Sequence, residues 1–149
     1  MSANAHDIKV LNGLIEALID CADGYTEAAR DTPEPRYSQW LDRRASQYLA
    51  LVETLKAEVR ARGGAPEDNG SILAKASRAF SGFKQAVLGH QTPIFQMIQS
   101  AEDQVRGRFE KASADTELSV TTRDIVRRGL EQLPLSQEDL SELDAMGHS

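Results

Sequence analysis

The sequence predicts an all-helical protein folded as an antiparallel bundle. Over long stretches its apolar residues recur at intervals of three and four, the period of a helix with one buried face. All five prolines fall between these stretches, and no segment alternates with the period of two that a half-buried strand requires. With 149 residues and 40% hydrophobic content, the chain is large enough for one core, so a single domain is expected.

The first two predicted helices are long. The first covers about residues 5–30, and the second is expected to have Thr32 as its N-cap, Pro33 in its first turn and Gly63 directly after its last residue. Their predicted buried residues are Leu11, Leu14, Ile15, Leu18, Ala22, Tyr25 and Ala29, followed by Tyr37, Trp40, Leu41, Tyr48, Leu51, Val52, Leu55 and Val59. The short connections predict antiparallel neighbours.

Three further amphipathic helices follow, over about residues 71–88, 93–114 and 117–133. Asp115 or Thr116 is the expected N-cap of the third of these. The fourth and fifth predicted helices would bury Ile94, Ile98, Ala101, Val105, Phe109 and Ala112, and then Leu118, Ile125, Val126, Leu130 and Leu133. The first four helices would form the bundle, and the fifth would pack against it or against a second subunit.

The expected organisation is one helical-bundle domain over residues 1–133, which includes the fifth helix. Residues 134–149 are predicted to form a short acidic C-terminal helix and tail, with Ser136 as the N-cap of that helix.

Composition limits the classes of partner. A net charge of −6, from 23 acidic and 17 basic residues, argues against a phosphate-backbone partner, so no nucleic acid is expected. No apolar run is long enough for a membrane span, and no membrane partner is expected. Because Cys21 is the only cysteine, the chain has no internal disulfide, and a cytoplasmic location is predicted.

No catalytic or cofactor motif is recognisable. None of the three histidines follows a glutamate by three residues, as the di-iron carboxylate bundles require, and nucleotide or nucleophile-elbow motifs are also missing. The first helix carries a row of acids that includes Glu16 and Asp20, but the row lies about 150° from the apolar stripe. It therefore predicts a solvated face more readily than a metal site.

Two charged residues fall within apolar stripes. Arg44 lies between Leu41 and Tyr48, and Glu102 lies about 60° from the centre of the fourth helix's stripe. Because a buried charge normally needs a partner, we expect Arg44 and Glu102 to form a structural ion pair. The alternative is a metal site at Glu102 with Glu16 and Asp20.

Residues 11–25, 62–71 and 101–105, with the connection Gly-Gly-x-Pro-Glu-Asp at 63–68, resemble a bacterial ferritin-like family catalogued as a domain of unknown function. The resemblance covers about residues 8–115. It implies a ferritin-like four-helix bundle and a role in stress response, with no established reaction. It also places Asp20, Gly24, Glu102 and Asp103 at positions of the family pattern. The chain departs from that pattern in having Phe83 alone on the third helix and no histidine in 130–145, which weakens an inherited metal site.

The sequence therefore predicts a non-catalytic helical module without cofactor, either oligomeric or bound to a protein partner through a groove or the fifth helix. The alternative is a ferritin-like carboxylate site for iron or manganese, serving storage or redox protection. A third reading has the acidic segment 136–144 docking onto a basic partner.

Overall fold

The computed structural model describes residues 2–67 and 94–147, and these residues form five helices and no strand. They are α1 (Ser2–Asp31), α2 (Pro35–Ala61), α4 (Ile94–Ser113), α5 (Val120–Gln132) and α6 (Gln137–Gly147). The all-helical fold class is confirmed for this part of the chain. The helix predicted over residues 71–88 lies outside the described residues.

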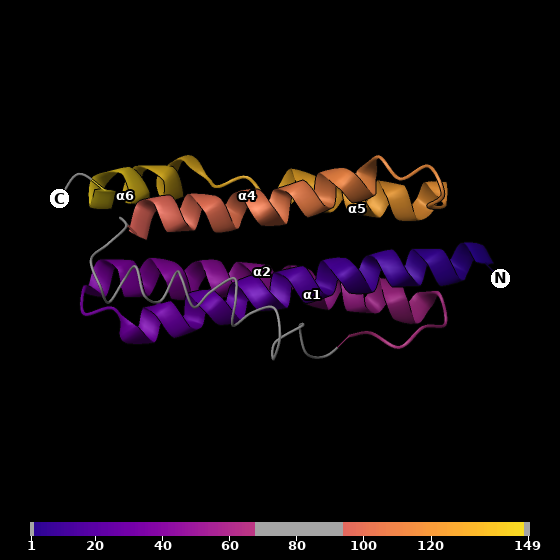
Figure 1. Ribbon diagram of the computed structural model, residues 1–149, viewed down its shortest axis with the longest axis horizontal. Coiled ribbons are helices and arrows are strands. Elements are labelled where there is room, and N and C mark those ends of the chain that lie inside the picture. Colours follow the sequence, from indigo (N-terminus) through magenta and orange to yellow (C-terminus); the bar gives the residue numbers. More distant parts are fainter. Residues whose placement is uncertain (1, 68–93, 148–149) are drawn as a thin grey trace.

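The helices are arranged in two layers (Figure 1). In one layer α1 and α2 lie side by side and run in opposite directions. In the other, α4 runs one way, and α5 and α6 return along it one after the other. The layers meet where α1 contacts α4 and where α6 contacts α2. Within the described ranges, no helix is both long and apolar enough to cross a bilayer.

Most residues of the predicted apolar stripes are buried in the core between these layers, and Tyr37, Ile125 and Leu130 pack against it partly buried. The side chain of Ile94 lies outside the described part of the structure. Tyr25, Trp40, Tyr48 and Phe109 are at most 2% exposed, and the ring of Tyr25 packs against the rings of Trp40 and Tyr48 with centroid distances of 6.2 Å in both cases. The fifth predicted helix contributes buried Leu118, Val126 and Leu133, so its apolar face belongs to the same core.

The turn between α1 and α2 differs from the prediction. Thr32 does not cap α2, because its backbone amide still donates to the carbonyl of Ala28 at 3.0 Å and so belongs to the end of α1. Glu34 is the N-cap instead, its carboxylate accepts from the amide of Arg36, and Pro35 rather than Pro33 occupies the first turn. Either proline could occupy the first turn of a helix. Pro35 does so here because the hydrogen bond from Thr32 to Ala28 keeps residue 32 in the last turn of α1.

The end of α2 is a Schellman motif. Gly63 has a φ of +82°, and its amide donates to the carbonyl of Arg60 while the amide of Gly64 donates to that of Val59, both at 3.0 Å. The predicted glycine cap is confirmed. A Cβ at Gly64 would lie 2.8 Å from the Ile8 side chain, so this glycine also allows α1 to pack closely against the turn.

The start of α5 was predicted three or four residues too early. Ser119 is its N-cap, and the Ser119 hydroxyl accepts from the amide of Thr122 at 3.2 Å. Asp115 instead stabilises the preceding turn by accepting from the amide of Glu117 at 2.9 Å. The buried carboxylate of Asp7 on α1 accepts from the Ser119 amide at 3.1 Å and from the hydroxyls of Ser119 and Thr122 at 2.7 and 2.8 Å. A residue from the other layer therefore fixes this helix start.

The last helix, α6, packs against the rest of the protein. As predicted, Ser136 caps it by accepting from the amide of Asp139 at 3.0 Å. Leu143 is only 2% exposed and joins the core cluster, and α6 contacts both α2 and α4. The acidic C-terminal segment is therefore packed against helices of both layers.

Candidate functional site

The centre of the described structure contains a buried ion pair between the two layers. Nη2 of Arg44 lies 2.7 Å from Oε1 of Glu102, and Nε of Arg44 lies 3.1 Å from Oε2. The two side chains are 5% and 13% exposed. The structure thus brings together the two charges that the sequence places in facing apolar stripes, in the bidentate geometry that favours an arginine–carboxylate pair.

Neighbouring groups complete the hydrogen bonding of this pair. Arg44 also donates to Gln47 at 2.8 Å and to the carbonyl of Leu133 at the end of α5, and its guanidinium lies 4.5 Å from the centroid of the Tyr48 ring. The hydroxyl of Tyr25 donates to Oε2 of Glu102 at 2.8 Å. Both carboxylate oxygens of Glu102 are therefore engaged, as expected of a buried charge that holds helices together.

The acid–base properties of this centre follow from its burial. Burial lowers the pKa of Arg44, but the hydrogen bonds and the charge of Glu102 outweigh it and leave that pKa above its ordinary value. Burial, with smaller contributions from nearby negative charge, raises the pKa of Tyr25, Tyr48 and Cys21. At neutral pH, Arg44 therefore stays charged, while the two phenols and the thiol stay protonated.

The other residues considered as metal ligands do not converge with Glu102. Glu16 and Asp20 are half-buried on α1, and Asp20 acts on Cys21 and Asp23 as a nearby negative charge. Where the structure describes the chain, only one set of three His, Cys, Asp or Glu side chains brings ligand atoms within 4.8 Å of one another, and it contains none of these three acids.

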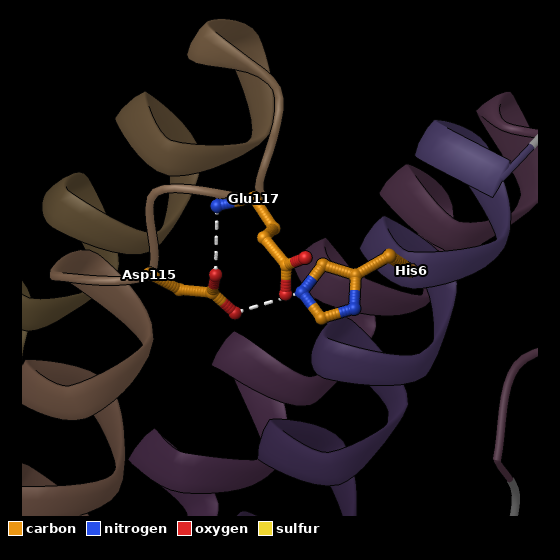
Figure 2. Close-up of side chains that lie close together, drawn as sticks. All are labelled: His6, Asp115 and Glu117. Atoms are coloured by element: carbon orange, nitrogen blue, oxygen red, sulfur yellow. Dashed lines mark hydrogen bonds and ion pairs between the residues drawn. The ribbon is translucent and has the colours of Figure 1, made fainter.

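That set consists of His6, Asp115 and Glu117. His6 comes from the first turns of α1, whereas Asp115 and Glu117 come from the connection between α4 and α5, and the three side chains point toward one another (Figure 2). Nε2 of His6 lies 2.8 Å from Oδ2 of Asp115. Sequence reasoning missed this cluster because 109 residues separate His6 from Asp115, and no local spacing motif links them.

A groove of about 520 Å³ lies along the contact between α4 and α6. Its lining residues are Ile98, Gln99, Glu102, Asp103, Arg106, Leu135, Leu140, Leu143 and Asp144. Leu140, on the edge, is 46% exposed and lies beside Leu135 and Leu143 in the groove lining. The groove therefore combines an apolar floor with a charged rim, and the buried pair reaches it through Glu102.

Comparison with protein families gives one relationship. The model of the family described as Domain of unknown function (DUF2383) matches residues 6–115, most of the chain. The chain belongs to this family. The DUF2383 region contains α1 from residue 6 onward, α2 and α4, and with them Arg44 and Glu102. Because α5 and α6 follow it, the groove has one wall inside the DUF2383 region and one beyond it. Searches of the curated proteins and of the solved structures found no match.

Proposed function

We propose that this chain is a non-catalytic helical-bundle module that oligomerises or binds a protein partner through the groove between α4 and α6. The observation that carries the proposal is the groove itself, with Leu140 46% exposed beside Leu135 and Leu143. Apolar grooves between helices typically accept the apolar face of an amphipathic helix. Burying Leu140 would contribute about 1–2 kcal/mol to such a complex.

The charge around the groove indicates the chemistry of the occupant. Asp103 and Asp144 lie on its rim, and Arg106 on the same rim is paired with Asp103. Of the acidic residues of α6 (Gln137–Gly147), Asp144 lines the groove, whereas Asp139 and Glu142 bond to Arg43 on α2. A helix with an apolar face flanked by Lys or Arg would complement this surface. The docking of the acidic C-terminal segment onto a basic partner is part of this proposal.

The saturated ion pair supports a structural rather than a catalytic role for the centre of the fold. In the alternative function, Glu102 would hold iron or manganese with Glu16 and Asp20 for storage or redox protection. Glu102 would then have to release Arg44 and Tyr25, and the arginine would remain buried beside the cation. The free energy that this rearrangement would cost favours the binding module over the metal site.

We further propose that the complete fold is an antiparallel, ferritin-like four-helix bundle. The opposite directions of α1 and α2, and of α4 and the α5–α6 pair, support this arrangement (Figure 1). The resemblance described from the sequence is the reason for placing the module in a bacterial stress response.

The oligomeric form of the proposal is tested by light scattering over a wide range of protein concentration. Leu49 on α2 is 43% exposed and does not line the groove, so it is the matched control for Leu140. We expect a mass above that of one chain for the wild type and for Leu49→Glu, and the monomer mass for Leu140→Glu. A wild type that is monomeric at every concentration would exclude oligomerisation and leave the binding of a different protein.

A further inference from the structure

We propose that His6, Asp115 and Glu117 form a binding site for a divalent transition-metal ion, separate from the groove. The set combines one imidazole nitrogen with two carboxylates, and their ligand atoms lie within 4.8 Å of one another. Imidazole suits zinc, iron and nickel, while carboxylates are common additional ligands of these ions. Three protein ligands with the remaining positions open to water are typical of accessible zinc and iron sites.

The distance between His6 and Asp115 is compatible with two ligands of one metal ion. Ligand atoms about 2.1 Å from an ion and at right angles to one another are about 3 Å apart, and tetrahedral ligands are about 3.4 Å apart. The His6–Asp115 separation of 2.8 Å is therefore close to that of two neighbouring ligands. A small outward movement of the Asp115 carboxylate would admit the ion, with Glu117 as the third ligand (Figure 2).

The backbone around the cluster is already held in place. The second oxygen of Asp115 accepts from the amide of Glu117 at 2.9 Å, which orients the carboxylate as outer-shell partners of metal ligands do. Directly after His6, the buried Asp7 accepts hydrogen bonds from Ser119 and Thr122. The two chain segments that supply the ligands are thus fixed to each other independently of any ion.

The local charge also favours a cation. Asp115 and Glu117 each offer a carboxylate oxygen to an ion. Asp115 is bonded to His6, and Arg123 acts on it as a more weakly felt positive charge. The side chains of His6 and Asp115 are 31% and 25% exposed and Glu117 is exposed, so an ion could reach the site from solvent and keep bound water.

A simpler role for His6 and Asp115 would be a hydrogen-bonded contact between α1 and the α4–α5 connection. Glu117 separates the two roles, because its carboxylate takes no part in the His6–Asp115 hydrogen bond. Glu117→Gln should therefore weaken metal binding and leave the contact intact. Glu131→Gln makes the same charge change at an exposed position of α5 and is the matched control.

The experiment uses the full chain, freed of metal by a chelator, and titrates it with Zn²⁺ in a calorimeter while Tm is measured in parallel. We expect a single zinc ion per chain, a Tm that rises with zinc, and no response to Mg²⁺ at the same concentration. Affinity should fall by about tenfold or more in Glu117→Gln and in His6→Gln, and should be unchanged in Glu131→Gln.

Unaltered zinc affinity in either Glu117→Gln or His6→Gln would overturn the proposed three-residue site, as would the absence of zinc binding by the wild type. If His6→Gln lowers stability, Glu117→Gln still decides the question, provided that its Tm without metal equals that of the wild type. A stable Glu117→Gln protein that binds zinc as well as the wild type would leave the cluster as a structural contact only.

Discussion

Arg44 on α2 and Glu102 on α4 are joined by two hydrogen bonds, of 2.7 and 3.1 Å, inside the core. The same guanidinium donates to the carbonyl of Leu133, the C-cap residue of α5. One side chain therefore connects three helices from both layers. Its energetic role depends on burial, because a buried charge left without its partner is far more costly than an exposed one.

Replacing Arg44 with methionine should lower the free energy of unfolding by about 3–5 kcal/mol, because Glu102 would stay buried without its countercharge. Arg128→Met is the control. Arg128 pairs with Asp124 at 2.9 Å, but both side chains are more than 40% exposed, so its loss should cost at most about 1 kcal/mol. Urea denaturation measures both variants. Equal losses would contradict a special role for the buried pair.

Asp7 should make stability depend on pH. Burial raises its pKa, but hydrogen bonds from Ser119 and Thr122 outweigh this and leave the pKa below its ordinary value. A lowered folded-state pKa stabilises the protein above about pH 4, and this contribution is lost as the pH falls through the folded-state value. Asp7→Asn should therefore cost about 1–3 kcal/mol at pH 7. The cost should shrink as the pH falls through the folded-state pKa of Asp7. Urea denaturation at neutral pH and at a series of acidic pH values measures this change, and a cost independent of pH would contradict this account.

Two helical glycines should respond oppositely to alanine. A Cβ at Gly129 on α5 would lie 2.8 Å from Cε2 of Phe109, which is fully buried, whereas a Cβ at Gly107 on α4 meets no described atom within 4 Å. We expect Gly129→Ala to destabilise by about 1–3 kcal/mol and Gly107→Ala to stabilise by about 0.5–1 kcal/mol. Thermal melts measure whether each variant is more or less stable than the wild type. A stabilised Gly129→Ala variant would show that α5 does not pack this closely on α4.

Cys21 should be chemically inert in the folded protein. Its side chain is 2% exposed, and burial raises the pKa of its thiol, so the reactive thiolate is not available at neutral pH. Alkylation by iodoacetamide should therefore follow the unfolded fraction as urea is added, with glutathione in the same solution as the reference thiol. Rapid labelling of Cys21 without urea would contradict both its burial and its lack of nucleophilic reactivity.

The sequence predicted the core better than the helix ends. Apolar residues at helical spacing, such as Leu11 and Phe109, are buried because periodicity determines which face a helix must cover. Helix starts were less predictable, since Thr32 and Glu34 each precede a proline and only the packed turn distinguishes them.

The site residues also differ in how far the sequence could predict their contacts. Arg44 and Glu102 stand out as charges within apolar stripes, and that local signal was enough to suggest their pairing. The His6 cluster carries no such signal, because it is created by contacts between α1 and the distant α4–α5 connection. A groove was expected from the sequence, but its position was not, because it exists only once α6 has packed beside α4.

The most direct test of the binding module is site-specific photocrosslinking in cells, with a photoreactive amino acid at position 140 and, as control, at position 49. Both leucines are similarly exposed, at 46% and 43%, but only Leu140 lines the groove. We predict one discrete crosslinked product from position 140, either a second copy of the chain or a protein with a basic amphipathic helix, and no such product from position 49. No product from position 140, or the same products from both positions, would contradict the proposal that this groove is the binding surface.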